Sequence, residues 1–354
     1  MRSLLSWLII IISIPILFAD QISPAWFWPL GFLSYLIPIV LLIHVIIVIY
    51  AVCKLKGILI IKHAGVLILG GRFLLRTVAF HSPSTSPDEK TISVLSYNVR
   101  VFDVYQHLHK DDPSKPIQLL NWVTQEESDI KCFQEFYNLD SSKIYNSLKK
   151  ISRQGSYRYY FTKVFKNEEG AAFGIATFSR FPIIKYESIP FQHSKNKALC
   201  TDLKVGEDTI RILNVHFQSI HLDEENLIDY EEYEKTKTKI RSLFLTLKKG
   251  FQKRAEQLKE VEIYIQNSPY PVILCGDLND LPYSYTYTRL NKFLNNAFEK
   301  AGNGFGFTHN GKLNFLRIDN QFFDSRFQIH SFETIHSIKF SDHYPIKAVY
   351  SLSK

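Results

Sequence analysis

The distribution of hydrophobic residues divides the sequence into two parts near residue 81. In the first part the apolar runs are long: residues 4–18 are interrupted only by Ser6 and Ser13, and residues 30–53 contain no Lys, Arg, Asp or Glu. In the second part, short apolar runs alternate with polar stretches. Long runs are typical of membrane-spanning helices, and short alternating runs of strands and amphipathic helices. The sequence therefore predicts an apolar anchor followed by a folded domain.

We predict two membrane spans, at about residues 3–19 and 30–53. The first run is short for a span, and Arg2 in front of it resembles a signal peptide, but no small-x-small cleavage site follows. The second run is long enough to cross a bilayer, and the tryptophans at 26 and 28 suit the membrane interface.

Residues 57–75 form a possible third span and decide on which side of the membrane the folded domain lies. They are apolar but contain Lys62, His63 and Arg72. Positive flanks at Arg2 and Lys54 place both of these positions in the cytoplasm. If residues 57–75 cross, the rest of the chain is outside the cytoplasm; if they lie in the interface as an amphipathic helix, it is cytosolic.

Beyond a Pro- and Ser-rich linker at residues 81–90, we expect one domain over residues 91–354. Many neighbouring strands with inserted helices favour mixed or antiparallel sheets packed face to face rather than a regular βαβ array. The long charged stretch 223–266 has a helical period, with Gly250 as its expected break. Further helices are predicted at 116–127, 141–151 and 285–294, and strands at 91–97, 130–134, 157–164, 174–179, 183–189, 198–205, 209–216, 272–275, 314–324, 328–336 and 346–352.

Charge and cysteine content narrow the range of functions that the sequence allows. The whole chain has a net charge of +8, but residues 1–81 carry +5 of it, so the folded domain is nearly neutral and does not demand a nucleic-acid partner. An aromatic content of 14% excludes intrinsic disorder. No pair of the four cysteines has zinc-ligand spacing.

Polar side chains directly follow several apolar runs of the second part. Each alone is most simply a helix cap or a turn residue, but the pattern recurs across the domain. Strand ends are where active sites are commonly assembled. The residues are Asn98, Glu135, Asn214, His216, Asp277, Asn279, Asp319, Asp342 and His343.

These residue types form a chemically coherent set. Carboxylates without cysteine ligands suit a hard cation such as Mg²⁺ or Mn²⁺. Two histidines and an additional aspartate suit proton transfer and the orientation of a water molecule. The chain has no Walker-type glycine-rich loop and no Gly-x-Ser-x-Gly, which disfavours NTP-driven and acyl-transfer chemistry.

The order of these motifs resembles the endonuclease/exonuclease/phosphatase superfamily, the DNase I-like fold. The resemblance covers residues 91–352 and rests on SYNVR, QE, FGIATFSRFPI, NVHFQS, GDLND, RID and SDH in that order. It implies a four-layered α/β sandwich (α+β) with two central, mostly antiparallel or mixed sheets flanked by helices. It also implies hydrolysis of a phosphoester by metal-assisted, in-line attack of water. The apolar anchor resembles a membrane-bound branch with a third span, which favours an extracytoplasmic domain.

The resemblance also implies roles for the site residues. Glu135 binds Mg²⁺, with Asn98 and Asp342 near the metal. His343, oriented by Asp319, and Asp277 compete as the general base. The remaining residues support the phosphate or orient its neighbours: Asn279 orients Asp277, His216 and Asn214 contact the phosphate, and Arg180 either supports it or makes a structural ion pair.

Three functions remain open at the level of sequence. The first is a membrane-anchored phosphodiesterase, nuclease-like, acting on nucleic acid, a lipid headgroup or a small molecule. The second is a phospholipid or inositol-phosphate phosphatase, or a sphingomyelinase-like hydrolase. The third is a catalytically inactive membrane scaffold, which the presence of all the catalytic acids disfavours. No obligate protein partner is inferred.

Overall fold

The computed structural model describes residues 2–82, 90–110, 112–192, 194, 196–219 and 233–353; within these ranges, the side chains of residues 2–3, 106, 110 and 233–240 are not described. The chain forms two compact units. The first comprises Met1–Val78, Ser219–Leu258 and Asp280–Arg289, and the second Ala79–Gln218, Lys259–Asn279 and Leu290–Lys354. Most of the expected linker, and residues 223–232 of the expected long helix, lie outside the described residues.

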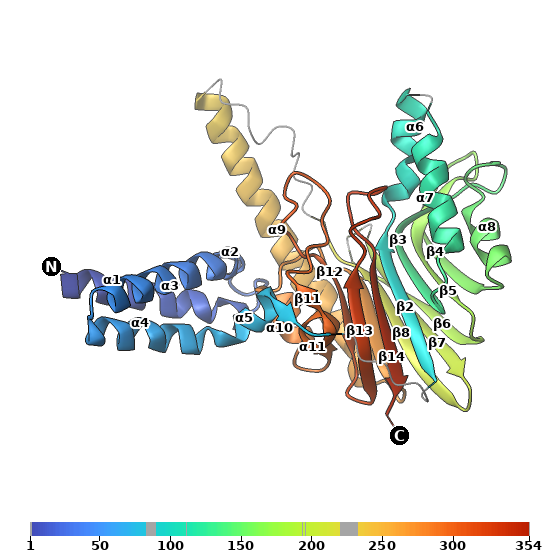
Figure 1. Ribbon diagram of the computed structural model, residues 1–354. Helices are drawn as coiled ribbons and strands as arrows, with labels where there is room; N and C mark the ends of the chain where they lie inside the picture. The colour runs from blue at the N-terminus through green and yellow to red at the C-terminus, as the bar shows by residue number, and fades with distance from the viewer. Residues whose placement is uncertain are drawn as a thin grey trace. The chain divides into compact units, whose positions relative to one another are not determined.

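The second unit contains two six-stranded sheets (Figure 1). The first has the order β13-β14-β2-β3-β5-β4, and its only parallel pair among the described strands is β2–β3. Its strands are β2 (Thr91–Asn98), β3 (Ile130–Asn138), β4 (Arg158–Lys166), β5 (Ala172–Ser179), β13 (Phe327–Thr334) and β14 (Ile346–Leu352).

The second sheet has the order β10-β12-β9-β8-β7-β6. The described pairs are antiparallel except β8–β9. Its strands are β6 (Ile183–Pro190), β7 (Lys197–Val205), β8 (Asp208–His216), β9 (Val272–Asp277), β10 (Asn295–Asn296) and β12 (Asp319–Phe323). A separate short pair joins β1 (Ala79–Phe80) to β11 (Asn303–Gly304).

Side chains that alternate between the two faces of each strand fill the core layers of the second unit. Ile92 and Val94 of β2 point into a core shared with Ile212 and Ile273 of the other sheet. The intervening Leu95 points to the opposite face, because successive side chains of a strand alternate between faces.

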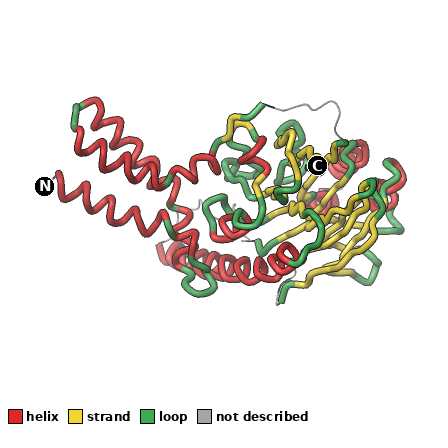
Figure 2. Tube along the Cα trace, turned by 90° about the horizontal axis from the view of Figure 1, so that it is seen from below, coloured by secondary structure: helices red, strands yellow, loops and turns green. Residues whose placement is uncertain are grey.

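Helices cover the outer faces of both sheets. On the first sheet, α7 (Ser114–Gln125) and α8 (Ser147–Gln154) contribute Leu119 and Ile151 to the outer core. On the second, Arg211 of β8 donates to the carbonyl of Tyr264 near the end of α9 (Tyr233–Gln266). Figure 2 shows the helices in red and the strands in yellow. The predicted pair of mixed sheets flanked by helices is confirmed.

The remaining elements are short. They are η2 (Arg100–Asp103), α6 (Val104–Lys110), α10 (Tyr285–Leu290) and α11 (Ala297–Ala301).

Three predicted boundaries are wrong. The helix α9 runs through Gly250 without a break, because one glycine in a long helix costs only about 1 kcal/mol. The helix expected at 141–151 begins only at Ser147, since Leu139 and Tyr145 close a turn through a backbone hydrogen bond. The strand expected from residue 314 begins at Asp319.

The first unit contains the apolar helices. They are α1 (Arg2–Leu17), η1 (Ala19–Gln21), α2 (Pro29–Tyr35), α3 (Ile37–Cys53), α4 (Gly57–Leu69) and α5 (Gly71–Thr77). Among the described residues, Leu4–Gln21 is the one helical stretch long and apolar enough to cross a membrane alone. The pairs α2–α3 and α4–α5 qualify only if each is counted as one span, because they bend by 43° and 59°. Pro38 in the first turn of α3 accounts for the first bend.

A buried ionic network joins distant segments of the first unit. Asp20 is fully buried and lies 2.8 Å from Arg72 Nη2 and 3.4 Å from Arg76 Nη1. The hydroxyl of Thr288 donates to Asp20 over 2.6 Å, and Arg76 also donates to the carbonyl of Pro282. Segment 280–289 is therefore fastened to the apolar helices by charge-assisted hydrogen bonds.

A buried lysine makes the stability of the second unit depend on pH. Lys131 of β3 is fully buried; its ammonium donates to the carbonyl of Val123 and lies 4.0 Å from Glu126. Burial lowers its pKa to about 8. Between that pH and the unfolded value of about 10.4 the unfolded chain binds more protons, so stability increases with pH in this window.

We therefore expect the free energy of unfolding of the wild type, relative to Lys131→Met, to rise by about 2–3 kcal/mol between pH 7.5 and pH 10. Denaturant unfolding of both proteins at the two pH values measures it. Lys185→Met, at an exposed position of β6, is the control and should show no such change. An identical difference at both pH values would contradict the prediction.

Candidate active site

The carboxyl ends of the parallel strand pairs bring the polar motifs to one edge of the sandwich. Asn98 ends β2, and His216 and Asp277 end the parallel strands β8 and β9 side by side. Asp319 begins β12, which pairs antiparallel with β9 so that Asp319 lies opposite Asp277. Residues more than 200 positions apart therefore meet because of strand order.

Asp277 lies at the centre of this cluster. Its side chain is 1% exposed. Its Oδ2 accepts hydrogen bonds from the side-chain amides of Asn98 (3.1 Å) and Asn279 (3.0 Å), and its Oδ1 accepts the backbone N–H of Asn279 (2.8 Å). His216 Nε2 and His343 Nε2 lie 3.7 and 3.8 Å from Oδ2. The carboxylate is thus fixed by amides and flanked by two imidazoles.

Glu135 lies on the more open side of the cluster. The pairing of β3 with β5 shifts register between Phe133 and Phe136, and Glu135 itself has φ of +48°. Such a bulge redirects a side chain out of the regular alternation. Its Oε1 accepts from Asn98 (3.2 Å) and lies 3.7 Å from His216 Nε2, while its side chain remains 37% exposed.

His343 and Asp319 form a buried pair. His343 Nδ1 and Asp319 Oδ2 are 2.8 Å apart, with side chains 8% and 2% exposed. The Thr308 hydroxyl oxygen accepts the backbone N–H of Asp319, and His309 forms an isolated bridge to His343. The geometry holds the imidazole with Nε2 directed towards Asp277.

Asp342 is tied to the cluster through its neighbours. Ser341 Oγ lies 2.8 Å from the carbonyl oxygen of Asn98 and 3.1 Å from Asp342 Oδ1. Arg100 Nε is 3.4 Å from Asp342 Oδ2, and Asn310 donates its backbone N–H to the Asp342 carbonyl (2.6 Å).

Several of these supporting residues had no predicted role. Arg100 and Ser341 stand inside two of the recognised motifs, so their position was visible in the sequence. Residues 308–310 lie in an irregular loop, where no periodicity marks them.

The segment after Asn98 has an unusual backbone. Four consecutive residues, from Arg100 to Asp103, have φ between 44° and 56° although none is glycine. Left-handed conformation costs about 1–2 kcal/mol per such residue. Phe102 is fully buried, and the centroid of its ring lies 5.2 Å from that of Phe136. This packing offsets part of the conformational cost. Stored strain of this kind is concentrated at functional sites.

Eight of the ten predicted site residues converge in this cluster, and two do not. Asn214 is fully buried between the sheets: it accepts from Gln134 and donates to the carbonyl of Ala176. Its amide is thus engaged in hydrogen bonds between the two sheets.

Arg180 is 3.8 Å from Asp129, just before β3, and lies beside the ring of Tyr157. Glu135 is six residues beyond Asp129, about 20 Å along a strand. The structure therefore places Arg180 in an ion pair with Asp129, away from the cluster.

The electrostatics of the cluster favour a bound cation. Burial raises the pKa of Asp277 to about 6, against the lowering effect of His343. Burial alone would lower the pKa of His343, but Asp319 and Asp277 together raise it well above its usual value. Asp319 Oδ1 is buried and accepts no hydrogen bond from the described residues. Asp277, Asp319 and His343 offer ligand atoms within 4.8 Å of one another. Carboxylates gathered in this way fit a divalent cation.

The family of the chain follows from its match to a family model. The model described as the endonuclease/exonuclease/phosphatase family matches residues 95–343, which include every residue of the cluster. The chain belongs to this family, whose members are phosphoric ester hydrolases.

Solved structures agree with the fold. An endonuclease/exonuclease/phosphatase from Beutenbergia cavernae is 14% identical, with a TM-score of 0.53 over 75% of this chain and 72% of its own. A family protein from Bacteroides thetaiotaomicron is 17% identical, with a TM-score of 0.53 over 75% and 100%. A humanized D. rerio TDP2 is 16% identical, with a TM-score of 0.50 over 74% and 99%. No curated protein sequence matches the chain.

Proposed function

We propose that this protein is a membrane-anchored, Mg²⁺-dependent phosphodiesterase, with its hydrolase domain at residues 91–354. The observation that carries the proposal is the convergence of motif side chains around the Asp277 carboxylate, namely the amides of Asn98 and Asn279 and the imidazoles of His216 and His343. A catalytically inactive scaffold would be expected to have lost at least one of these groups, and all of them are present.

Glu135 is the proposed metal ligand, with Asn98 and Asp342 beside it. Glu135 and Asp342 are the partly exposed carboxylates of the cluster, with side chains 37% and 35% exposed, and Glu135 shares Asn98 with Asp277. The alternative ligand set is Asp277, Asp319 and His343. Mg²⁺, or Mn²⁺ in its place, would polarise a phosphoryl oxygen and neutralise its developing charge.

Other side chains of the cluster are proposed to accept the proton of the water, to orient Asp277 and to contact the phosphate. Asp277 and the Asp319-oriented His343 are the two candidates for taking the proton of the attacking water. Asn279 orients Asp277 through two hydrogen bonds. His216, 3.7 Å from both Glu135 and Asp277, is placed to donate to a phosphoryl oxygen as negative charge increases there.

The apolar helices support membrane attachment with an extracytoplasmic hydrolase domain. Large apolar side chains are exposed on all three helical segments, including Ile12 (62%), Ile46 (57%) and Ile68 (79%). Exposed apolar surface of this extent marks a surface that contacts a membrane or another protein, and its place on long apolar helices favours the membrane. Three spans would place Arg2 and the lysines after Cys53 on the cytoplasmic side and Val78 on the other.

The substrate class is a phosphodiester, nuclease-like, with a phospholipid or inositol-phosphate phosphatase or a sphingomyelinase-like activity as the alternative. A substrate panel with the full chain in neutral detergent separates them. It contains bis(p-nitrophenyl) phosphate, the matching monoester, DNA, RNA, sphingomyelin and inositol phosphates, each with Mg²⁺ and with EDTA. We expect diester cleavage that EDTA abolishes; activity unaffected by EDTA would exclude the metal-dependent mechanism.

The metal ligands are tested by the Mg²⁺ dependence of the rate. Glu135→Gln is expected to raise the Mg²⁺ concentration for half-maximal activity by about tenfold or more, because it removes a charged ligand. Asp319→Asn should leave that concentration nearly unchanged and lower kcat. A higher Mg²⁺ requirement in Asp319→Asn but not in Glu135→Gln would assign the metal to Asp277, Asp319 and His343. Arg180→Gln, outside the cluster, is the control for both.

A further inference from the structure

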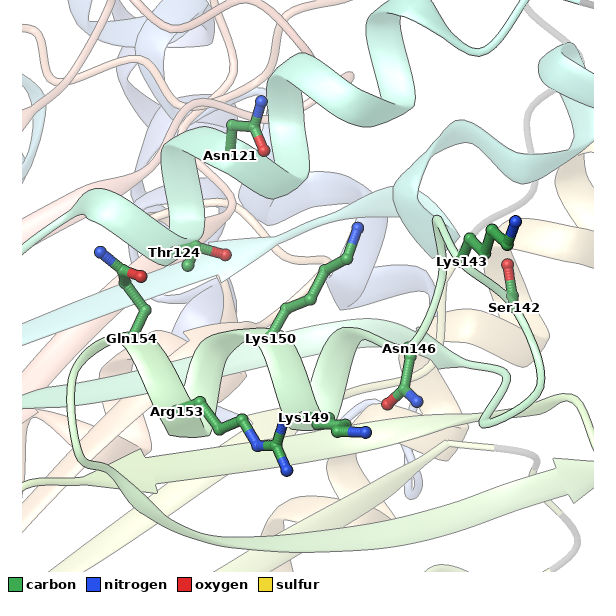
Figure 3. A pocket seen from close by; sticks show the side chains of 9 residues that line it. All are labelled: Asn121, Thr124, Ser142, Lys143, Asn146, Lys149, Lys150, Arg153 and Gln154. Carbon is green, nitrogen blue, oxygen red and sulfur yellow. The ribbon is translucent and has the colours of Figure 1, made fainter.

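A strongly basic groove lies between α7 and α8, apart from the candidate active site. It encloses about 530 Å³, and none of its lining residues belongs to the catalytic cluster. Figure 3 shows the helix with Asn121 and Thr124 on one side and α8 on the other. The lining residues are Asn121, Thr124, Ser142, Lys143, Asn146, Lys149, Lys150, Arg153 and Gln154.

The charge of the groove is of one sign. Four lining residues are cations and none is acidic, although the chain contains 34 acidic residues. Neither α7 nor α8 contains an acidic residue. None of the four cations makes an ion pair with a described residue. Some other basic side chains of the same unit do have acidic partners, as Arg211 has Asp202 and Lys347 has Glu126.

The placement of these cations would attract an anion. Lys149 and Arg153 are one helical turn apart on α8, and like charges at that spacing repel. Lys150 is half-buried, and in Figure 3 it rises from α8 towards α7 into the space between them. Lys143 stands at one end of the groove beside Ser142. An anion between the helices would neutralise charges that the fold itself leaves uncompensated.

The neutral lining residues indicate what kind of anion fits. All five are hydroxyl or amide side chains, and no aromatic or aliphatic residue lines the groove. Proteins that hold single-stranded nucleic acid stack its bases on aromatic side chains, and surfaces that insert into a lipid interface present apolar side chains. The residues that line the groove offer neither. Its volume is within the range of small-ligand sites. We propose that this groove is a non-catalytic binding site for a small ligand carrying clustered phosphate groups.

Binding of inorganic pyrophosphate tests the proposal. Isothermal titration calorimetry is performed on the full chain in neutral detergent with EDTA, which removes divalent cations. We expect the double variant Lys143→Gln/Lys150→Gln to raise Kd at least tenfold. In the wild type, Kd should rise with KCl concentration because salt screens exposed charges. The matched control Lys166→Gln/Lys185→Gln removes two exposed charges outside the groove and should leave Kd unchanged.

Two further measurements identify where the anion binds. Glu135→Gln should bind pyrophosphate as the wild type does; loss of binding there, with retention in the groove variant, would overturn the proposal. Circular dichroism and diesterase activity of the groove variant should match the wild type, which separates loss of binding from misfolding. If the groove binds single-stranded DNA or phosphatidylglycerol vesicles but not pyrophosphate, a small phosphorylated ligand is likewise excluded.

Discussion

Replacing Asp277 with asparagine is expected to lower kcat for phosphodiester hydrolysis by about 10²–10⁴-fold at saturating Mg²⁺. The side chain keeps its size but loses its charge and one acceptor. In the wild type, Oδ2 accepts from the amides of both Asn98 and Asn279. An asparagine there must either turn its own NH₂ towards these donors or rotate away from them. The variant therefore loses both a candidate proton acceptor and the group that holds the cluster together.

The fold is expected to tolerate this change. Burial raises the pKa of Asp277 and so disfavours its charged form, and removing the charge relieves that cost and offsets part of the loss of hydrogen bonding. Thermal unfolding should change little while kcat falls. Asp324→Asn is the matched control: it lies just after the opposite end of β12 from Asp319 and pairs with the exposed Arg326. Full activity in Asp277→Asn would exclude Asp277 from the chemistry. The Asp319-oriented His343 would then be the remaining candidate for the general base.

Replacing Asp20 with alanine is expected to destabilise the first unit by about 3–5 kcal/mol. Asp20 is fully buried against Arg76, whose side chain is 8% exposed. Its removal leaves a guanidinium in a site with little access to water. Thr288 also loses the acceptor of a 2.6 Å hydrogen bond. The loss should exceed that of an ordinary surface ion pair, which contributes about 0–1 kcal/mol.

The measurement is thermal or denaturant unfolding of the full chain in detergent. Asp208→Ala, at an exposed acid in the hairpin between β7 and β8, is the control and should be nearly neutral. A double-mutant cycle with Arg76→Gln tests the pairing itself. The double variant should be less destabilised than the sum of the single variants. Additive losses would show that Asp20 and Arg76 do not interact directly.

The sequence correctly placed together those candidate residues that lie at strand ends. Asn98, His216 and Asp277 each follow a buried apolar run, and parallel neighbours in a sheet bring such ends together. The same reasoning placed Asn214 with the site, although it precedes the end of β8 by two residues. Because side chains two positions apart share a face, it shares a face with His216 but lies deeper, where it pairs with Gln134.

The role of the two residues after the RID motif was also decided by packing. These residues are Asn320 and Gln321. In the structure Gln321 is fully buried and donates to the carbonyls of Val94 and Ile346, while Tyr350 donates to it. A hydrogen-bonded amide thus occupies the space between the sheets and leaves Asp319 in position.

The sequence by itself determined the apolar N-terminal segment, the two mixed sheets and the identity of eight clustered side chains. These follow from local periodicity and from motifs in which each residue stands beside its own strand. Only the tertiary structure decided which partners those residues have. The pairing of Arg180 with Asp129, the place of segment 280–289 beside Asp20, and the basic groove between α7 and α8 all depend on contacts between segments distant in the chain. Periodicity reports which face of an element is buried, but it carries no information about which other segment covers that face.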